Sequence, residues 1–393
     1  MKFGIYVHIP YCLQRCTYCD FATYERSKIF PSNEYVSVLE AEITQRANYF
    51  GPRPLDTLYF GGGTPSLLPP QEILTVIRSL AKHGYKIQPH TEVTIEINPA
   101  TIDDSKLRQY LDMGFNRFSV GAQTFDDRLL KMVHREHNAR QTVETLELLS
   151  SKNLNFSFDL LFALPTQTLE GVREDVRRAI ELGASHLSPY CLTVPEGHPL
   201  SKGRAPEDEQ VEMFELIFSQ LESAGFLPYE ISNFAKPGFE AQHNLLYWTD
   251  EEYWGLGLSA HSYKKSPPWG TRFWNVSNIN EYRTQIERTL GQTFDSPNHD
   301  RSEEDYEILK PHQSLTDFCH TSLRLMKGLS LPSLTQKFPE HFVKKAQERL
   351  DSMVRRQLLT KTDKGDGTYA LTRSGLVVSN RVFAEMTFLS EDV

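Results

Sequence analysis

Apolar and polar positions alternate along this chain with two different periods, and their order predicts the fold. Runs rich in β-branched and aromatic residues predict strands, whereas apolar residues at helical spacing, such as Tyr35, Leu39 and Ile43, predict helices. Strands are predicted over residues 3–9, 55–60, 91–97, 117–120, 155–162 and 185–192. Helices are predicted between them, over residues 33–50, 70–83, 104–113, 140–151 and 169–182. Strands that alternate with helices predict an α/β fold with a parallel sheet, either doubly wound or barrel-like.

The pattern changes near Pro297, where the alternation of strands and helices stops. Beyond it, helices are predicted over residues 317–326, 341–355 and 374–384. Two short strands are predicted on either side of residues 364–367, whose sequence is a hairpin-turn signal. The predicted organisation is therefore a core over residues 1–235, a connecting region over 236–300 and a small C-terminal module over 301–393.

Composition and charge narrow the class of protein. Of the 393 residues, 39% are hydrophobic and 24% are charged, and no apolar run approaches the length of a membrane-spanning helix. The net charge of −9 argues against binding to a phosphate backbone. Residues 301–393 carry 14 Lys and Arg against 13 Asp and Glu, so this module also lacks the basic face that DNA reading requires.

Three of the five cysteines lie together in the loop after the first predicted strand. Cys12, Cys16 and Cys19 form a C-x-x-x-C-x-x-C array. Three thiols so close together cannot all pair as disulfides, and their short spacing suits one compact soft-metal site. Ordinary buried cysteines or half of a zinc site are the alternatives, but no second C-x-x-C pair exists to complete a zinc ribbon. Three ligands are one short of a four-iron cluster, which leaves a position open for a substrate or cofactor. Cys191 and Cys319 stand apart, and we interpret them as structural.

The other candidate site residues share one position, at or near the carboxyl ends of predicted strands. Parallel sheets and barrels place their sites at this end. Gly61, Gly62 and Gly63 leave the backbone open to a ligand there. Asp159 lies in an apolar run, where a buried carboxylate needs a partner or a ligand. Taken alone, a polar residue at the end of a strand is more often a surface residue that faces water.

The cysteine array, with Tyr18 directly before its last cysteine, resembles the cluster loop of radical S-adenosylmethionine (radical SAM) proteins. The resemblance implies a [4Fe–4S] cluster on the three cysteines and SAM on the open iron, cleaved to a 5′-deoxyadenosyl radical. It also implies a partial (β/α)6 barrel, similar to a TIM barrel, which favours the barrel over the doubly wound sheet. At the C-terminus it implies a small, mainly helical winged-helix-like domain.

Further motifs resemble the oxygen-independent coproporphyrinogen III oxidase branch of these proteins. The G-G-x-T-P element implies that Gly62, Gly63 and Thr64 hold the methionyl amino group of SAM. The remaining SAM contacts implied by the resemblance are Tyr6 of Y-x-H-x-P-x-C, Glu96 of E-x-N-P, Gln123 of G-x-Q-x-F, Arg135 of H-R-x-H and Asp159 of F-D-L-x-x-x-L-P.

Two departures from the oxidase pattern favour the heme-chaperone subgroup of this branch, the HemW proteins. Phe21 stands where the oxidases have a further cysteine, and the chain begins two residues before its first strand, without the oxidases' N-terminal extension. Residues 243–248 read H-N-x-x-Y-W, which resembles the heme-associated signature of the subgroup. An imidazole is a good axial ligand for heme iron, so His243 is the predicted heme ligand and His261 a second candidate.

The predicted function is therefore a heme chaperone that delivers heme to acceptor proteins. The alternatives are an oxygen-independent coproporphyrinogen III oxidase, or radical SAM chemistry on another substrate. The predicted partners are heme, heme-accepting proteins and an electron donor for the cluster, without nucleic acid; a homodimer and peripheral membrane association stay open. A cytoplasmic location is expected, because the cysteines cluster for metal binding and Met1 leads straight into a strand, leaving no room for a signal peptide.

Overall fold

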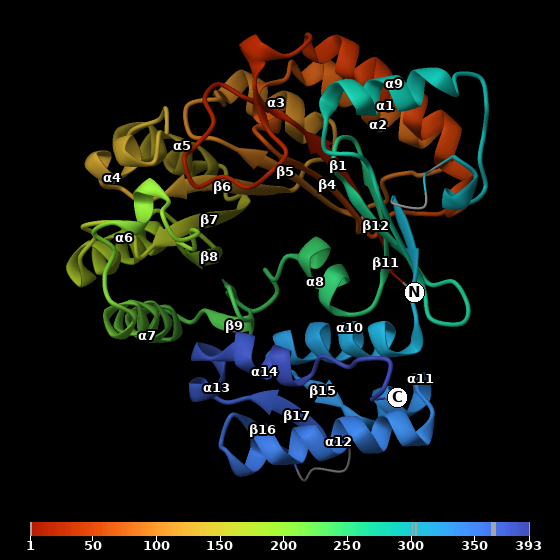
Figure 1. Cartoon of the computed structure of the whole chain (residues 1–393). Coiled ribbons are helices and arrows are strands. Elements are labelled where there is room, and N and C mark those ends of the chain that lie inside the picture. Colours follow the sequence, from red (N-terminus) through yellow and green to blue (C-terminus); the bar gives the residue numbers. More distant parts are fainter. Residues whose placement is uncertain (1, 301, 303–304, 363–366, 393) are drawn as a thin grey trace.

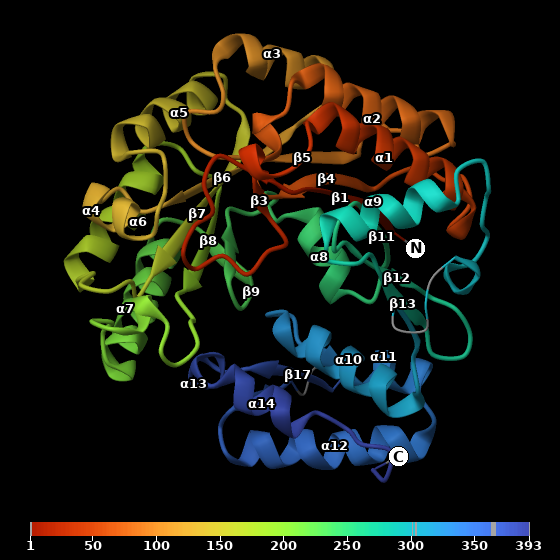
Figure 2. The same ribbon diagram turned by 45° about the horizontal axis from the view of Figure 1, so that its top comes forward.

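The centre of the molecule is a curved sheet whose parallel part has the strand order β11-β1-β4-β5-β6-β7-β8. The computed structural model describes residues 2–300, 302, 305–362 and 367–392. The parallel strands are β1 (Phe3–Ile9), β4 (Thr57–Gly62), β5 (Glu92–Ile97), β6 (Arg117–Gln123), β7 (Asn155–Phe162), β8 (His186–Cys191) and β11 (Glu252–Leu256). The sheet bends into an open arc, as Figures 1 and 2 show, and its carboxyl strand ends lie at one rim.

Helices cover the convex face of this arc and return the chain to the start of the next strand (Figure 2). They are α1 (Ser32–Arg46), α2 (Pro70–Lys82), α3 (Asp104–Asp112), α4 (Asp127–Met132), α5 (Ala139–Ser151) and α6 (Leu169–Glu181). Local signals fix their starts: Asn138 and Gln141 form a reciprocal capping box at α5, and the Thr168 hydroxyl caps α6. Apolar strand residues such as Ile5 and Val7 are buried in the core, so the alternate residues face the concave side.

Antiparallel strands extend the sheet at both edges. β10 (Asn233–Ala235) and β9 (Leu227–Glu230) follow β8, whereas β12 (His261–Lys264), β13 (Thr271–Trp274) and β14 (Tyr306–Ile308) follow β11. The cysteine loop carries a small separate pair, β2 (Tyr11–Cys12) and β3 (Tyr24–Glu25). Helices α7 (Glu207–Ser223), α8 (Gln242–Trp248) and α9 (Ile279–Arg288) complete this part of the chain.

Helix α8 lies inside the arc rather than outside it (Figures 1 and 2). It packs against the amino-terminal ends of β1 and β4, where Gly4 makes room for it: a Cβ on Gly4 would lie 2.3 Å from Leu246 Cδ1 and 3.2 Å from His243 Nδ1. The Glu92 carboxylate accepts hydrogen bonds from the backbone amides of Gln242 and His243 and so holds the first turn of α8. The helix therefore closes the amino-terminal end of the partial barrel.

The C-terminal module follows β14 and lies on the side of α8, drawn in blue in Figure 1. It consists of α10 (Pro311–Arg324), β15 (Leu329–Ser330), α11 (Leu331–Lys337), α12 (Glu340–Arg355), β16 (Leu359–Lys361), β17 (Thr368–Leu371), α13 (Arg373–Val377) and α14 (Ser379–Glu385). Its strands pair in the order β15-β17-β16, all antiparallel, and the order of its first elements is that of a winged-helix domain. Its contacts with α8 include the Arg324 guanidinium, 4.4 Å from the Trp248 ring centroid.

The predicted fold class is confirmed: an α/β partial barrel with a small, mainly helical C-terminal domain. Strand β7 has the predicted bounds, whereas β6 runs three residues further, to Gln123, and the predicted helix over 374–384 is divided into α13 and α14. The hairpin signal at 364–367 lies largely outside the described residues, although β16 and β17 on either side of it pair as expected. The sheet continues through β11 and β14, past both predicted domain boundaries, and those boundaries stay predictions.

Candidate functional site

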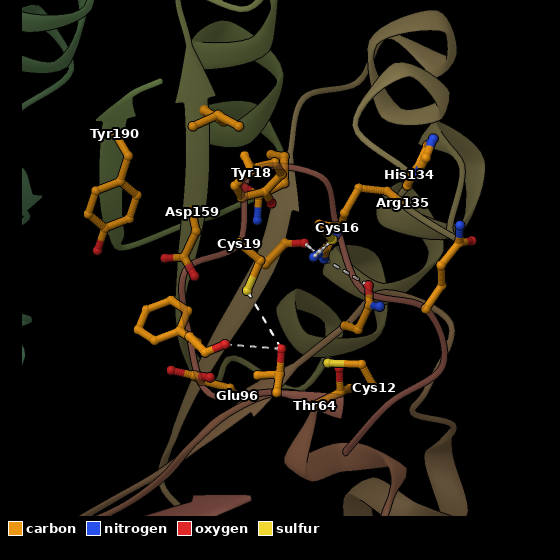
Figure 3. A pocket seen from close by; sticks show the side chains of 18 of the residues that line it. Cys12, Cys16, Tyr18, Cys19, Thr64, Glu96, His134, Arg135, Asp159 and Tyr190 are labelled. Carbon is orange, nitrogen blue, oxygen red and sulfur yellow. Dashed lines mark hydrogen bonds between the residues drawn. The ribbon is translucent and has the colours of Figure 1, made fainter. Parts of the chain in front are cut away.

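A cavity of about 440 Å³ lies at the carboxyl ends of the parallel strands, and we call it the first cavity (Figure 3). It is bounded by the cysteine loop, the glycine run after β4 and the ends of β5, β6 and β7. Ten of the predicted site residues line it, namely Cys12, Cys16, Cys19, Gly62, Gly63, Thr64, Glu96, Gln123, Arg135 and Asp159. The fold therefore brings together residues that are up to 147 positions apart in the sequence.

The three cysteines of the loop are free thiols that face this cavity. Burial raises the pKa of the Cys12 thiol to about 11, so binding of a metal there must release a proton. Cys16 Sγ lies 3.6 Å from an Arg135 nitrogen, and Cys19 Sγ lies 3.8 Å from the Thr23 hydroxyl. In the described part of the chain no three His, Cys, Asp or Glu side chains converge on a single metal ion. A four-iron cluster does not require this, because each cysteine binds a different iron.

The glycine run after β4 is fixed by close contacts that exclude a side chain. Gly62 has a φ of +112°, and a Cβ on it would lie 2.5 Å from the His8 ring. A Cβ on Gly63 would lie 2.7 Å from the carbonyl oxygen of Tyr11. The run is thus a bare stretch of backbone beside the cysteine loop, as a site that holds a ligand through backbone atoms requires.

Glu96 joins the glycine run to the barrel interior. Its carboxylate accepts hydrogen bonds from the Gly62 amide at 3.0 Å and the Tyr59 hydroxyl at 2.9 Å. Burial raises the pKa of the Glu96 carboxyl to about 7, and the nearby negative charge of Asp159 adds to this effect. The Glu96 carboxyl therefore ionises near neutral pH, and in its ionised form it can attract a cationic group of a ligand.

Asp159 lies opposite Arg135 across the first cavity, on the side of Tyr190 (Figure 3). Burial raises the pKa of its carboxyl to about 6, and hydrogen bonds from Ser188 and Ser119 act in the opposite direction. The prediction from sequence that this carboxylate needs a polar partner is met by the two serines.

Arg135 connects the cysteine loop with the strand ends. Besides Cys16, its guanidinium contacts the Asn98 side chain at 2.9 Å and donates to the carbonyl oxygen of Gly121. Its Nε is buried and has no hydrogen-bond acceptor within the described residues. Gln123 lies beside it in the left-handed region, with a φ of 70°, at an irregularity in the pairing of β6 and β7. This bulge turns Gln123 toward the cavity.

A second cavity of about 520 Å³ occupies the interior of the partial barrel. Phe21, Glu96, Asp159 and Tyr190 line both cavities, so the two adjoin. A packed barrel core would be filled by branched apolar side chains. Here the lining from the strands is polar or aromatic instead, comprising Tyr6, His8, Tyr59, Glu96, Arg117, Ser119, Asp159, His186, Ser188 and Tyr190. A hollow interior with this lining is typical of a binding site.

His243 lies at the α8 end of the second cavity, and both of its ring nitrogens are engaged. Nδ1 is 2.6 Å from the Thr57 hydroxyl, and Nε2 is 2.9 Å from the Tyr247 hydroxyl. Burial lowers the pKa of His243 to about 3, so the ring is neutral at physiological pH. His261 lines the same cavity but is exposed, and its ring stacks on Trp274 with the centroids 5.5 Å apart. Tyr6, predicted to contact SAM, also lines the second cavity and not the first.

Sequence reasoning missed several residues of the two cavities. Arg117 and His186 are the first residues of β6 and β8, and both line the barrel interior. Tyr190 lies between the two cavities and lines both of them. The signal that could have found them is strand alternation, because Arg117 and Ser119 alternate with buried Phe118 and Val120.

Comparison with known proteins identifies the family. The family model of the Radical SAM superfamily matches residues 6–179. Over 399 residues the chain is 32% identical to the heme chaperone HemW of Bacillus subtilis (strain 168), covering 98% of this chain and 99% of that protein. The chain belongs to the HemW family of radical SAM proteins. The HemW protein of Escherichia coli (strain K12) is 37% identical over 263 residues, covering 66% of this chain and 69% of that protein.

A solved structure shares the fold. Coproporphyrinogen III oxidase (HemN) from Escherichia coli, a radical SAM enzyme, matches with a TM-score of 0.81 over 98% of this chain and 90% of that chain, at 20% sequence identity. Helices long and apolar enough to cross a membrane are absent from the described part of the chain.

Membership of the radical SAM family implies a [4Fe–4S] cluster and SAM as cofactors, and the first cavity fits them. It combines free thiols, a glycine cradle that any Cβ would fill, a buried Arg135 nitrogen without an acceptor and two carboxylates. When bound, the cluster and SAM supply one-electron chemistry. The chain's own residues would bind and orient these groups, and the carboxylates of Glu96 and Asp159, when ionised, would place negative charge where a cationic ligand group could bind.

Proposed function

We propose that this protein is a heme chaperone that binds a [4Fe–4S] cluster through Cys12, Cys16 and Cys19, SAM in the first cavity and heme in the second cavity. The SAM contacts would come from Gly62, Gly63, Thr64, Glu96, Gln123, Arg135 and Asp159 of the first cavity, and from Tyr6, which lines the second cavity. The protein then passes heme to acceptor proteins. Its kinship with HemW proteins over nearly its whole length supports this function.

The observation that carries the proposal is that the two cavities adjoin and share lining residues. Phe21 and Tyr190 line the first cavity, which would hold the cluster and SAM. The same two side chains also belong to the aromatic lining of the second cavity, inside the barrel. Phe21 is 65% exposed and Tyr190 is 45% exposed, although both are large apolar rings. Exposed rings at the entrance to a hollow, tyrosine-rich interior suit a flat, apolar ligand such as a porphyrin.

Ligation of heme iron by His243 requires a local rearrangement. Iron at Nε2 would replace the 2.9 Å hydrogen bond to the Tyr247 hydroxyl, while the bond from Nδ1 to Thr57 would keep the ring oriented. His261 offers an exposed ring at the cavity mouth without such an exchange. We propose His243 as the axial ligand, with His261 as the competing residue that the experiment must separate from it.

A second candidate function is oxygen-independent coproporphyrinogen III oxidation. The similarity in fold to HemN favours it, because that enzyme shares the barrel and the C-terminal module. Phe21 opposes it, because a phenylalanine at the border of both cavities cannot supply the thiol that the oxidase pattern has there.

Anaerobic reconstitution followed by two assays tests the proposal. Heme titration should give a saturable shift of the Soret band, and the loaded protein should transfer heme to an apo heme protein. Incubation with coproporphyrinogen III, SAM and a reductant should yield no protoporphyrinogen. Absence of saturable heme binding, or robust turnover in the second assay, would overturn the chaperone function.

A matched pair of variants tests the axial ligand. His243→Ala should alter the Soret shift and weaken heme binding, whereas His261→Ala should leave both unchanged. The reverse pattern would assign the iron to His261.

We further infer that the protein acts in the cytoplasm, with an electron donor and heme-accepting proteins as partners, since its cysteines suit a reducing compartment.

A further inference from the structure

Arg117 is a buried cation inside the partial barrel that has no close partner among the residues that the structure describes. It is the first residue of β6, is 3% exposed and lines the second cavity. Its Nε has no hydrogen-bond acceptor within the described residues, and the ion pair with Glu92 has a separation of 4.0 Å. Glu92 is already engaged with the first turn of α8. The guanidinium therefore faces the cavity with unused donors.

His186 lines the same cavity and has a second buried nitrogen without a partner among the described residues. The residue is 1% exposed, and its Nδ1 has no partner in the described part of the chain. Its Nε2 lies 2.9 Å from the Tyr229 hydroxyl, which accepts a hydrogen bond from the Asn244 side chain at 3.2 Å. If the tyrosine donates its single proton to Nε2, the neutral imidazole carries its proton on Nδ1. Both Arg117 and His186 then have unused donors beside the cavity.

Burial of hydrogen-bond donors without acceptors costs folding free energy. The unpaired donors of Arg117 and His186 therefore indicate that a ligand supplies their acceptors. A buried cation is stabilised by a paired anion with hydrogen bonds, and an arginine fits a carboxylate through two parallel bonds. Glu96 and Asp159 lie two register positions or more toward the carboxyl ends of their strands, and neither forms an ion pair with Arg117 in the described part of the chain. Burial raises the pKa of Asp159, and the positive charge of Arg117 only partly offsets this effect. A ligand in the second cavity can supply the acceptor that these side chains do not provide.

We propose that Arg117, assisted by His186, binds a carboxylate of the ligand that occupies the second cavity. The identity of the ligand rests on the proposed function: for heme, the group is a propionate, and the macrocycle lies against the cavity's tyrosines. The carboxylate then sits at the α8 end of the barrel, and the ring system extends toward the cluster side.

Titrations of the reconstituted protein with heme and with heme dimethyl ester test this inference, because esterification removes the negative charge and leaves the macrocycle unchanged. The wild-type protein should bind heme more tightly than the ester by about tenfold to a hundredfold, as expected for a charge-assisted hydrogen bond. Arg117→Met should lose this preference by weakening heme binding alone, and Arg117→Lys should keep part of it. Arg178→Met is the matched control, because Arg178 lies over the Phe125 ring outside both cavities.

Thermal unfolding separates a binding role from a structural one. Arg117→Met removes an incompletely paired buried charge, so the unliganded variant should unfold at the same temperature as the wild type or higher. A variant that unfolds at lower temperature and loses affinity for heme and for the ester by the same factor would show that Arg117 only supports the barrel. Equal heme affinity in the wild type and Arg117→Met would also overturn the inference.

Coproporphyrin III, a tetracarboxylate, distinguishes this inference from the proposed function. Binding of coproporphyrin III that depends on Arg117, in a protein that does not bind heme, would uphold the carboxylate site and reject the chaperone function. Binding of neither tetrapyrrole would reject both.

Discussion

Replacement of Glu96 by glutamine should stabilise the unliganded protein and weaken its binding of SAM. The glutamine oxygen can accept the Gly62 amide bond, and its nitrogen can donate to the Tyr59 hydroxyl, so the local packing is retained. What changes is the charge. Burial of the carboxyl group raises the pKa of Glu96 from 4.5 to about 7, and the negative charge of Asp159 adds to this effect.

The direction of the effect follows from proton linkage. Between pH 4.5 and about pH 7 the folded protein keeps the Glu96 proton that the unfolded chain loses, so stability falls as the pH rises through this window. Each pH unit corresponds to about 1.4 kcal/mol. Because the carboxyl also faces water in the cavity, the ionised group should cost about 2 to 3 kcal/mol at about pH 8, and less than about 1 kcal/mol at about pH 5. Glu96→Gln removes this cost.

Urea unfolding of the apoprotein at both pH values measures the difference in the free energy of unfolding. Glu42→Gln is the control of opposite sign, because Glu42 is buried against Arg46 at 2.6 Å, and its loss takes one of the two carboxylates, Glu42 and Asp300, away from that buried cation. It should destabilise the protein at both pH values. An equal effect of Glu96→Gln at about pH 5 and about pH 8 would refute the linkage. SAM binding at about pH 8 should weaken in Glu96→Gln, since the carboxylate attracts a cationic ligand.

Three further substitutions test other parts of the structure. Cys16→Ala should lose iron and the broad visible absorbance of the cluster, and full retention of iron would contradict the ligand assignment. Gly62→Ala should destabilise the protein by about 1 to 3 kcal/mol and prevent SAM binding, because its Cβ meets the His8 ring; an unchanged urea midpoint would contradict the close contact. Arg324→Met should destabilise by about 1 to 3 kcal/mol, since it leaves the buried carboxylate of Glu230 without its ion pair at 2.6 Å, and wild-type stability would show that this pair contributes nothing.

The strands of the core could be predicted closely because each is a short apolar run bounded by a turn signal. β7 is the clearest case, since its eight residues are mostly apolar and Pro165 follows shortly afterwards. β11 could not be predicted in the same way. It joins the sheet parallel to β1 after a separation of more than 240 residues, and no local pattern specifies which strand it will pair with.

The candidate site divides in the same way. The sequence by itself determined the cysteine loop and the glycine run, because their chemistry depends on the spacing of neighbouring residues. Only the tertiary structure decided that the Arg117 Nε and the His186 Nδ1 are buried without partners among the described residues and that His243 is held by two hydroxyl groups. Burial and pairing depend on what the rest of the fold packs around a side chain, and here α8, seated on Gly4, closes the cavity in which these groups lie.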